Sequence, residues 1–587
     1  MFSREDSASP GRGDSAANQD KTEGSDNIAA SLTCAVLGVC VVFVMVLDWR
    51  FPYIHQLPLF DLDYITTIML MFARNWWIEG PWHMLFSMPY APLSVETAMP
   101  DLRYGMYQSW PPGAVLPIYL LALLTKTEPN ITMVNWLNVG CHGLIALFLS
   151  LSAYFAAKIL RRPKIERVAL AIMVGCIVLF PRGLVFFFSQ VYAFDTFIVV
   201  FYALLMFVAM LELHAPDRRS AERYYYLQIA IFVCGLFVDW LFYPVFAVWF
   251  ALRLVGSWTA YGRPLRRSEA CGLVILPLAT FSMFLFWRFK TPGSIAAKDG
   301  MLASIRELLW KFIYRIGETD DHPMSAAGFF GPFYESHRYF FWNAAPILLG
   351  AGFIVCLALF AALFTMSRTD PGARKTYFGL FSIFLLSIVP AYMELILLKQ
   401  HTAIHLWAIA KVVVPLAMVA GVFLPLLTVA TLERWQLVLT GLRWQRAWRS
   451  VGTLGVLAFA FWIGAAAWPG KAPYLLGRID PAAPVPWLTL HEQTSYNDVL
   501  FSPDFETVPF RTEAAIAGKL VYRASSFADI DRKVENICVP FNVVVVRNTP
   551  DGEVFDGRTP YSVIRAGGLT LLRFQTYQGA AKSCPKA

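Results

Sequence analysis

Long apolar runs alternate with short polar connectors over most of the 587-residue sequence. A helical membrane span needs about 17–25 consecutive, mostly apolar residues. Eleven runs meet or approach this length, and the two on either side of Asp239 are the shortest. They cover residues 28–47, 132–157, 167–184, 190–211, 225–238, 241–256, 270–289, 345–366, 376–397, 405–431 and 450–468. The pattern predicts an α-helical polytopic membrane protein with about 11 transmembrane helices.

Basic residues gather in every second connector between the predicted spans. Nineteen Lys and Arg residues lie in connectors 158–167, 212–223, 253–267, 367–375 and 433–449, whereas the alternate short connectors hold only two. Lys and Arg residues mark the cytoplasmic side of membrane proteins. The pattern therefore predicts a cytoplasmic N-terminus and an extracytoplasmic C-terminus.

One apolar stretch, Gly113 to Leu124, is too short to cross a membrane. Counting it as a span would turn the basic connectors to the outside, against the positive-inside rule. The Pro111-Pro112 pair before it favours a break in the chain. We therefore predict an interfacial or re-entrant helix within a long outer loop, 48–131, and a second outer loop at 290–344.

The two ends of the chain differ from its apolar middle. Residues 1–27 are rich in Ser, Asp and Gly, which predicts a disordered cytoplasmic tail before a transmembrane domain at 28–468. From residue 469 the composition becomes that of a soluble protein. Strand patterns at 520–523, 541–547 and 569–574, with a helical pattern at 527–536, predict a small α/β extracytoplasmic C-terminal domain, residues 469–587.

The composition supports a membrane protein and argues against a nucleic-acid-binding one. Hydrophobic residues make up 57% of the chain and charged residues 15%, with a mean hydropathy of +0.51. Soluble proteins have about 25% charged residues, and lipid-facing helices explain the deficit because they cannot carry charge cheaply. The net charge of +8 comes from residues between apolar runs, so we expect membrane lipids and no nucleic acid as partners.

The first outer loop opens with two aspartates, Asp61 and Asp63, one residue apart. On an extended segment both side chains would face the same way. A carboxylate near a membrane boundary can act as a general base toward an acceptor hydroxyl, or ligate a divalent cation. The alternative is structural, because Asp63 precedes a helix-like segment that it could cap.

A second polar group precedes and enters the run at 405–431. On a helix, His401 and His405 would share one face, near Lys399 and with Lys411 farther along. Such a cationic face could bind a phosphate or pyrophosphate leaving group. Lys411 lies within an apolar run, where a charge is expensive unless it is paired or used. The alternatives are snorkelling of Lys399 and histidines that seek the interface.

Three further sites carry candidate substrate-binding residues. Gln190 and Tyr192 lie near the outer start of a span together with Asp195, and Asp239-Trp240 lies at an outer turn. Helix capping and ordinary interfacial placement of Trp explain these residues as well. Loop 290–344 adds Arg338, which could belong to a substrate-covering loop or to an ordered connector.

The order of these motifs resembles the GT-C superfamily of membrane glycosyltransferases. Phe60-Asp61-Leu62-Asp63 stands where such enzymes carry an acidic motif, and Ser109-Trp110-Pro111-Pro112-Gly113 resembles the stretch that opens a periplasmic helix. Asp239-Trp240 resembles an Asp-Trp pair of some bacterial members, and His401 to Lys411 resembles the lipid-phosphate segment. The chain departs by having Asp-Leu-Asp instead of an adjacent acidic pair, which leaves open which aspartate is the base.

The resemblance implies sugar transfer from a polyprenyl-phosphate-linked donor to an acceptor hydroxyl on the periplasmic face of a bacterial inner membrane. The acceptor would be an envelope glycan, lipid or protein. The base would be Asp63 or Asp61, and the donor phosphate would lie near Lys399, His401, His405 and Lys411. Participation of a divalent cation, Mg²⁺ or Mn²⁺, is left open. The competing hypotheses are a lipid-glycan transporter or flippase and a non-catalytic envelope assembly protein.

Overall fold

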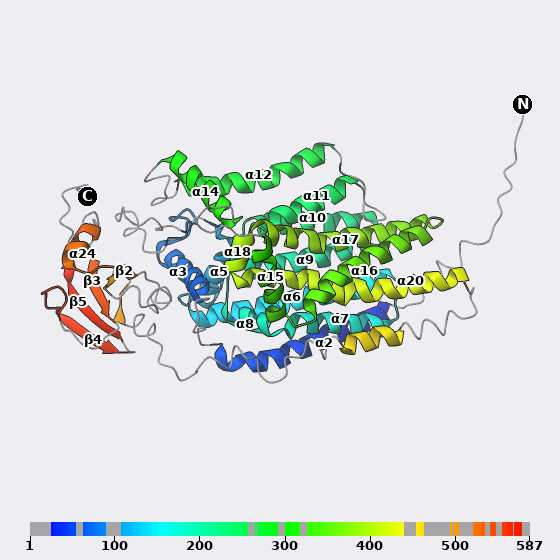
Figure 1. Cartoon of the computed structure of the whole chain (residues 1–587), viewed down its shortest axis with the longest axis horizontal. Helices are drawn as coiled ribbons and strands as arrows, with labels where there is room; N and C mark the ends of the chain where they lie inside the picture. Colours follow the sequence, from blue (N-terminus) through cyan, green and yellow to red (C-terminus); the bar gives the residue numbers. More distant parts are fainter. Residues whose placement is uncertain are drawn as a thin grey trace, which may run out of the picture.

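The computed structural model of the chain describes residues 25–54, 63–89, 107, 109–255, 265, 267–290, 300–316, 326–439, 453–462, 493–495, 498–503, 521–534, 541–547, 554–566 and 569–577. A large helical body occupies one part and a small sheet another (Figure 1). The sheet lies beyond the end of the body that carries helices α3, α5 and α18, and the N-terminus lies toward the opposite end.

The body consists of long helices joined by short ones, and several are broken. In chain order they are α2 (Ser25–Arg50), η2 (Phe51–Tyr53), α3 (Asp63–Glu79), η3 (Pro112–Ala114), α5 (Leu116–Thr125), α6 (Ile131–Ile159), α7 (Lys164–Leu179), α8 (Arg182–Gln190), α9 (Phe194–His214), α10 (Arg218–Leu236), α11 (Phe242–Val255), α12 (Arg267–Lys290), α14 (Met301–Arg315), α15 (Ala326–Phe340), α16 (Ala345–Met366), α17 (Pro371–Leu397), α18 (Lys399–Ile404), η4 (Leu406–Val412), α19 (Val413–Leu416), η5 (Ala417–Phe423) and α20 (Leu424–Leu439). A further short helix covers residues 453–462.

Among the described residues, seven helices are long and apolar enough to cross a membrane. They confirm the predicted spans at 28–47, 132–157, 190–211, 270–289, 345–366, 376–397 and 405–431. The span predicted at 167–184 is instead a bent pair, α7 and α8, which meet at 66° and would raise the count to eight. The chain is therefore a multi-pass membrane protein with a mostly helical body.

The three remaining predicted spans also fall on helices, but these are shorter or more polar. Helix α10 begins with charged residues on its first turn, which lowers its mean hydropathy, and α11 has 14 residues. The described part of the predicted span 450–468 is a ten-residue helix, Thr453–Trp462. Length and hydropathy therefore favour seven or eight full crossings among the described residues instead of eleven.

The stretch 113–124 forms a short helix, as predicted. Helix α5 has ten residues and follows a single turn, η3, that begins at Pro112. The backbone N–H of Gly113 donates to the Phe237 carbonyl at 2.9 Å. A Cβ on Gly113 would lie 2.3 Å from that oxygen, so only glycine allows this close approach. The contact holds the Pro-Pro segment against the turn between α10 and α11.

The broken pair α7–α8 is fastened to its neighbours by buried polar side chains of α6. Asn138 donates to the carbonyls of Phe187 and Val191 at the end of α8. His142 contacts the Val178 carbonyl at 2.8 Å near the bend, and Arg50 at the end of α2 contacts the other ring nitrogen. Buried backbone groups freed by a helix break need such partners inside a membrane protein.

The C-terminal part contains a five-stranded sheet in the order β2-β1-β3-β5-β4. The strands are β1 (Asp498–Ser502), β2 (Val521–Arg523), β3 (Phe541–Arg547), β4 (Ser562–Ala566) and β5 (Leu569–Tyr577), and helix α24 (Phe527–Val534) follows β2. Strand β1 pairs in parallel with β2 and β3, whereas β5 runs antiparallel to β3 and β4. Phe527, Ile530 and Val534 of α24 join the core on one side of the sheet. The predicted small α/β unit is confirmed.

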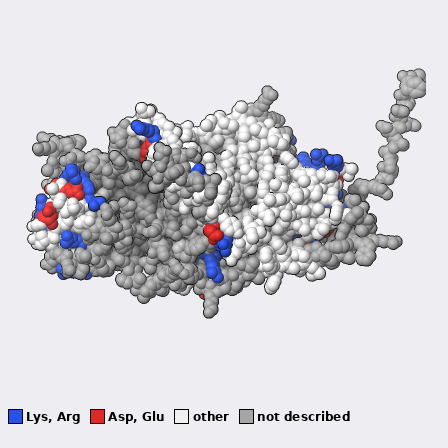
Figure 2. All heavy atoms as spheres, in the orientation of Figure 1, with Lys and Arg blue, Asp and Glu red and all other residues white. Residues whose placement is uncertain are grey.

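Figure 2 shows how charge is distributed over one face of the molecule. The middle of the helical body is almost free of charged side chains there, and a group of basic side chains marks the end away from the sheet. An uncharged band of this kind suits a hydrocarbon environment.

Candidate functional site

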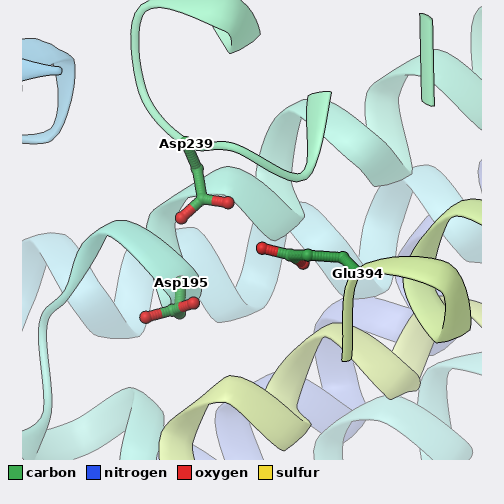
Figure 3. Close-up of side chains that lie close together, drawn as sticks. All are labelled: Asp195, Asp239 and Glu394. Atoms are coloured by element: carbon green, nitrogen blue, oxygen red, sulfur yellow. The ribbon is translucent and has the colours of Figure 1, made fainter. Parts of the chain in front are cut away.

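A buried ion cluster lies where four separate parts of the helical body meet. The ammonium Nζ of Lys411 lies 2.7 Å from Asp195 Oδ1, 3.1 Å from Asp239 Oδ1 and 2.7 Å from Glu394 Oε1. All four side chains are at most 5% exposed. Figure 3 shows the three carboxylates directed toward one another. The ammonium donates hydrogen bonds to Asp239 and Glu394, and its contact with Asp195 is an ion pair.

Local backbone structure explains how each carboxylate is held. Asp195 lies in the first turn of α9, where the helix dipole favours negative charge. Asp239 lies in the turn between α10 and α11 and accepts hydrogen bonds from the Leu241 backbone N–H at 2.8 Å and Trp110 Nε1 at 2.9 Å. Glu394 lies one turn before the end of α17. Lys411 comes from the tighter helical segment η4. Three acids share one lysine, so the cluster carries a surplus of negative charge.

The indole of Trp110 contacts both this anionic cluster and a second cation, Arg315. Its N–H contacts Asp239, and its ring lies 5.0 Å from the His401 ring and 5.9 Å from the Phe194 ring. The guanidinium of Arg315, the last residue of α14, lies 4.0 Å from the Trp110 ring centroid. Stacking on the indole face leaves the in-plane N–H edge of a guanidinium able to bind an anion.

The two histidines lie together, as the spacing predicts, with ring centroids 4.6 Å apart. His401 Nε2 lies 3.6 Å from Asp195 Oδ2. Burial lowers the pKa of His401, although Asp195 opposes the effect. Burial, assisted by the neighbouring His401, lowers the pKa of His405 to about 3. Both imidazoles are therefore neutral at neutral pH and can donate hydrogen bonds without carrying charge.

Of the predicted residues, Gln190 is the last residue of α8, and Tyr192 lies on the short turn that leads into α9. The Thr66 hydroxyl donates to the Gln190 carbonyl and accepts from the Tyr192 backbone N–H, both at 3.0 Å. Thr66 stands three residues after Asp63, the first residue of α3. Thr66 thus joins the first turn of α3 to the turn before Asp195.

Other predicted site residues take different positions. Asp61 lies outside the described residues, as does the side chain of Asp63. Trp240 donates to the Ser109 carbonyl at 2.9 Å and so supports the segment that carries Trp110. Lys399 is half-buried at the start of α18. Arg338 forms a partly exposed ion pair with Glu335 on its own helix, α15.

Sequence reasoning missed Glu394, Trp110 and Arg315 as parts of the site. Glu394 is an acid inside a long apolar run, and the rule that such a charge must be paired or used could have found it. The sequence groups Asp195 with Gln190 and Tyr192, with helix capping as the alternative, and gives no sign of its contact with Lys411. The stacking of Arg315 on Trp110 joins residues about two hundred positions apart, and no local pattern predicts it.

The three carboxylates also form a group of the kind that could hold a divalent cation, because their oxygens lie within 4.8 Å of one another. Oxygen ligands suit Mg²⁺ or Mn²⁺. The Lys411 ammonium, however, already contacts all three acids. A second cation at this point would meet electrostatic repulsion, so these residues do not fit a metal while Lys411 remains in place.

Comparison with known proteins gives fold neighbours but no sequence family. No protein-family model and no curated protein match the chain. The solved structures that it resembles in overall arrangement include an archaeal oligosaccharyltransferase and the bacterial protein ArnT.

One of these neighbours is ArnT from Cupriavidus metallidurans bound to undecaprenyl phosphate, with 14% identity, a TM-score of 0.49, and coverage of 94% of this chain and 99% of that one. Another is the oligosaccharyltransferase AglB from Archaeoglobus fulgidus, in complex with an inhibitory peptide and a dolichol-phosphate, with 10% identity, a TM-score of 0.45, and coverage of 88% and 69%. At these identities, the likeness concerns the overall arrangement of the chain and does not extend to substrates.

Proposed function

We propose that the chain transfers a sugar from a polyprenyl-phosphate-linked donor to an acceptor hydroxyl in assembly or modification of the cell-envelope glycan. The observation that carries the proposal is the placement of opposite charges around Trp110. The carboxylate of Asp239, with its two acidic neighbours, lies at the N–H edge of the indole, and the Arg315 guanidinium lies over the ring. Sugar transfer needs both kinds of charge within a short distance.

The anionic side suits the sugar. Glycosyl transfer passes through a transition state with oxocarbenium-like positive charge on the ring. Fixed negative charge in a low-dielectric surrounding stabilises such a charge more strongly than in water. Asp195, Asp239 and Glu394 would act through this field without touching the sugar, because they are buried.

The cationic side suits the leaving group. A guanidinium binds phosphate through two parallel N–H donors, which makes Arg315 the main candidate for the lipid phosphate. The neutral imidazoles of His401 and His405, together with Lys399, would add hydrogen bonds. Lys411 was expected in this role, but its contacts with three carboxylates make it a positioning residue.

The acceptor hydroxyl would lose its proton to Asp63 or Asp61. Asp63 begins α3, whose first turn Thr66 holds against the turn before Asp195. The contact of Thr66 with Gln190 and Tyr192 supports a role for Asp63 near the acceptor.

The test is complementation of a deletion strain, followed by glycan analysis of its envelope. We expect the deletion to remove a sugar that the wild-type gene restores, and Asp61→Asn/Asp63→Asn to restore nothing while folding normally. Asp217→Asn, an exposed helix cap at α10, is the matched charge control. A complete envelope glycan in the single and double aspartate variants would overturn the proposal.

Arg315 is tested in the same strain against Arg306, an exposed arginine on the same helix. Arg315→Gln should strongly reduce the restored sugar and cause the lipid-linked donor to accumulate, whereas Arg306→Gln should behave like the wild type. Equal restoration by both variants would remove Arg315 from the proposed phosphate site.

A further inference from the structure

Helix α14 has an outward face of large apolar side chains. Its residues Met301, Leu302, Ile305, Leu309, Phe312 and Ile313 are 38–80% exposed. At about 100° per residue, these six positions fall within one arc of about 120°. They form a continuous apolar stripe along the helix, which we call the α14 stripe.

The inward face of α14 is polar. Ser304 is fully buried and accepts a hydrogen bond from Arg288 Nε at 3.0 Å. Glu307 forms ion pairs with Arg288 and with Lys311, the latter at 2.6 Å. Arg315 completes this face by stacking on Trp110. The helix is thus amphipathic in the reverse sense, with Glu307, Lys311 and Arg315 turned toward protein and the apolar stripe turned away from it.

Reverse amphipathicity identifies the surroundings of the helix. A helix in water exposes its polar face and buries its apolar one, so the observed orientation is favourable only next to an apolar medium. Helix α12, which α14 contacts through Arg288, is long and apolar enough to span a membrane and exposes Ile275, Leu278 and Phe286 in the same way. The α14 stripe therefore continues a lipid-facing surface.

We infer that the α14 stripe is inserted among the acyl chains of the membrane leaflet nearest the ion cluster. This insertion holds Arg315 against Trp110. Exposed Lys290, at the end of α12, supplies a cation for anionic lipid headgroups. The occupant is ordinary bilayer lipid instead of a second protein chain. This inference stands apart from the proposed sugar transfer, because it concerns where the helix lies and not what the site converts.

Site-specific photo-crosslinking tests directly whether the α14 stripe contacts lipid. The full chain, reconstituted in nanodiscs of phosphatidylethanolamine and phosphatidylglycerol, would carry p-benzoylphenylalanine at Leu302 or Leu309. Irradiation should give lipid adducts by intact mass spectrometry, as at Ile275 on α12, and few adducts at half-buried Leu308. Absence of lipid adducts at Leu302 and Leu309 while Ile275 reacts would overturn the inference, as would crosslinked dimers in place of lipid adducts.

Hydrogen exchange tests the coupling to Arg315 without any enzyme assay. Leu302→Glu/Leu309→Glu should speed amide exchange across residues 301–315 in nanodiscs and leave α16 unchanged. Arg306→Glu changes charge on the same helix outside the stripe and is the matched control. Equal exchange in the double variant and the control would show that lipid contact does not hold α14 in place.

Discussion

At the residue scale, the strongest constraint is the single ammonium of Lys411 among three buried carboxylates. Removing one partner of a buried ion pair costs about 3–5 kcal/mol, because the remaining charge stays desolvated. We therefore expect Lys411→Met to lower the melting temperature and the folded yield strongly. Thermal unfolding of the purified protein in nanodiscs measures this change.

Two further variants separate charge balance from lost packing. Lys411→Met/Glu394→Met removes one charge of each sign, so it should be more stable than Lys411→Met alone. Arg218→Met breaks an exposed pair with Glu222, which should change stability by less than about 1 kcal/mol. A Lys411→Met protein as stable as the wild type would contradict the ion cluster.

His405 predicts a pH dependence of stability. Its pKa falls from 6.5 to about 3 in the folded protein because burial disfavours the charged imidazole. The unfolded chain therefore binds a proton more readily than the folded one between these values. The stabilising contribution is present above pH 6.5 and is lost as the pH falls toward 3. The melting temperature of His405→Gln should fall less steeply on acidification than that of the wild type.

The control for this titration is His83→Gln, which changes an exposed histidine. It should keep the wild-type slope of melting temperature against pH. If His405→Gln and His83→Gln give the same slope of melting temperature against pH, burial does not lower the pKa of His405.

Individual residues of the site could be found from the sequence when their local context was unusual. Lys411 was marked by its place in an apolar run, and Asp239 by its place at a turn between two apolar runs. The sequence did not reveal that Lys411 is neutralised by acids, because Asp195, Asp239 and Glu394 come from three separate helical regions. A phosphate-binding role was therefore assigned to a lysine whose donors are already used.

At the element scale, the contact of Thr66 with the turn before α9 predicts a coupling between α3 and the ion cluster. Thr66→Val removes the partner of two buried backbone groups, at Gln190 and Tyr192, which costs about 1–3 kcal/mol for each group left unpaired. We expect lower stability and, under the proposed function, less restored envelope sugar. Thr365→Val, which loses only an exposed hydrogen bond within its own helix, is the control.

Amide hydrogen exchange shows whether the effect of Thr66→Val is local. Faster exchange limited to the first turn of α3 and residues 190–193, with the rest of the body unchanged, supports the local coupling. A Thr66→Val protein that matches Thr365→Val in stability and in restored sugar would exclude it.

The elements themselves were predicted unevenly, for physical reasons. Long spans such as 345–366 follow directly from length and hydropathy. The bend between α7 and α8 was missed because the apolar run continues through Pro181, and only packing against α6 shows the break. Strand β3 was placed at its observed bounds, whereas β1, a central strand of five buried residues, has no alternating pattern to reveal it.

At the scale of the whole molecule, the sheet and the ion cluster are expected on one side of the membrane and the basic connectors on the other. The sheet lies beyond the end of the body that carries α3 and α18, and basic side chains gather toward the opposite end (Figures 1 and 2). Because Lys and Arg are retained in the cytoplasm, the C-terminal domain should be periplasmic. This orientation would give the site access to lipid-linked donors and to the envelope, where nucleotide sugars are scarce.

Fusions to the two termini test this orientation. Alkaline phosphatase folds only in an oxidising compartment, so a C-terminal fusion should be active, and a fluorescent protein that matures only in the cytoplasm should be dark there. The same fluorescent protein at the N-terminus should be bright. A bright C-terminal fusion with inactive phosphatase would place the sheet in the cytoplasm. Bright fluorescence at both termini would instead show an even number of crossings, such as eight, and would contradict the predicted orientation.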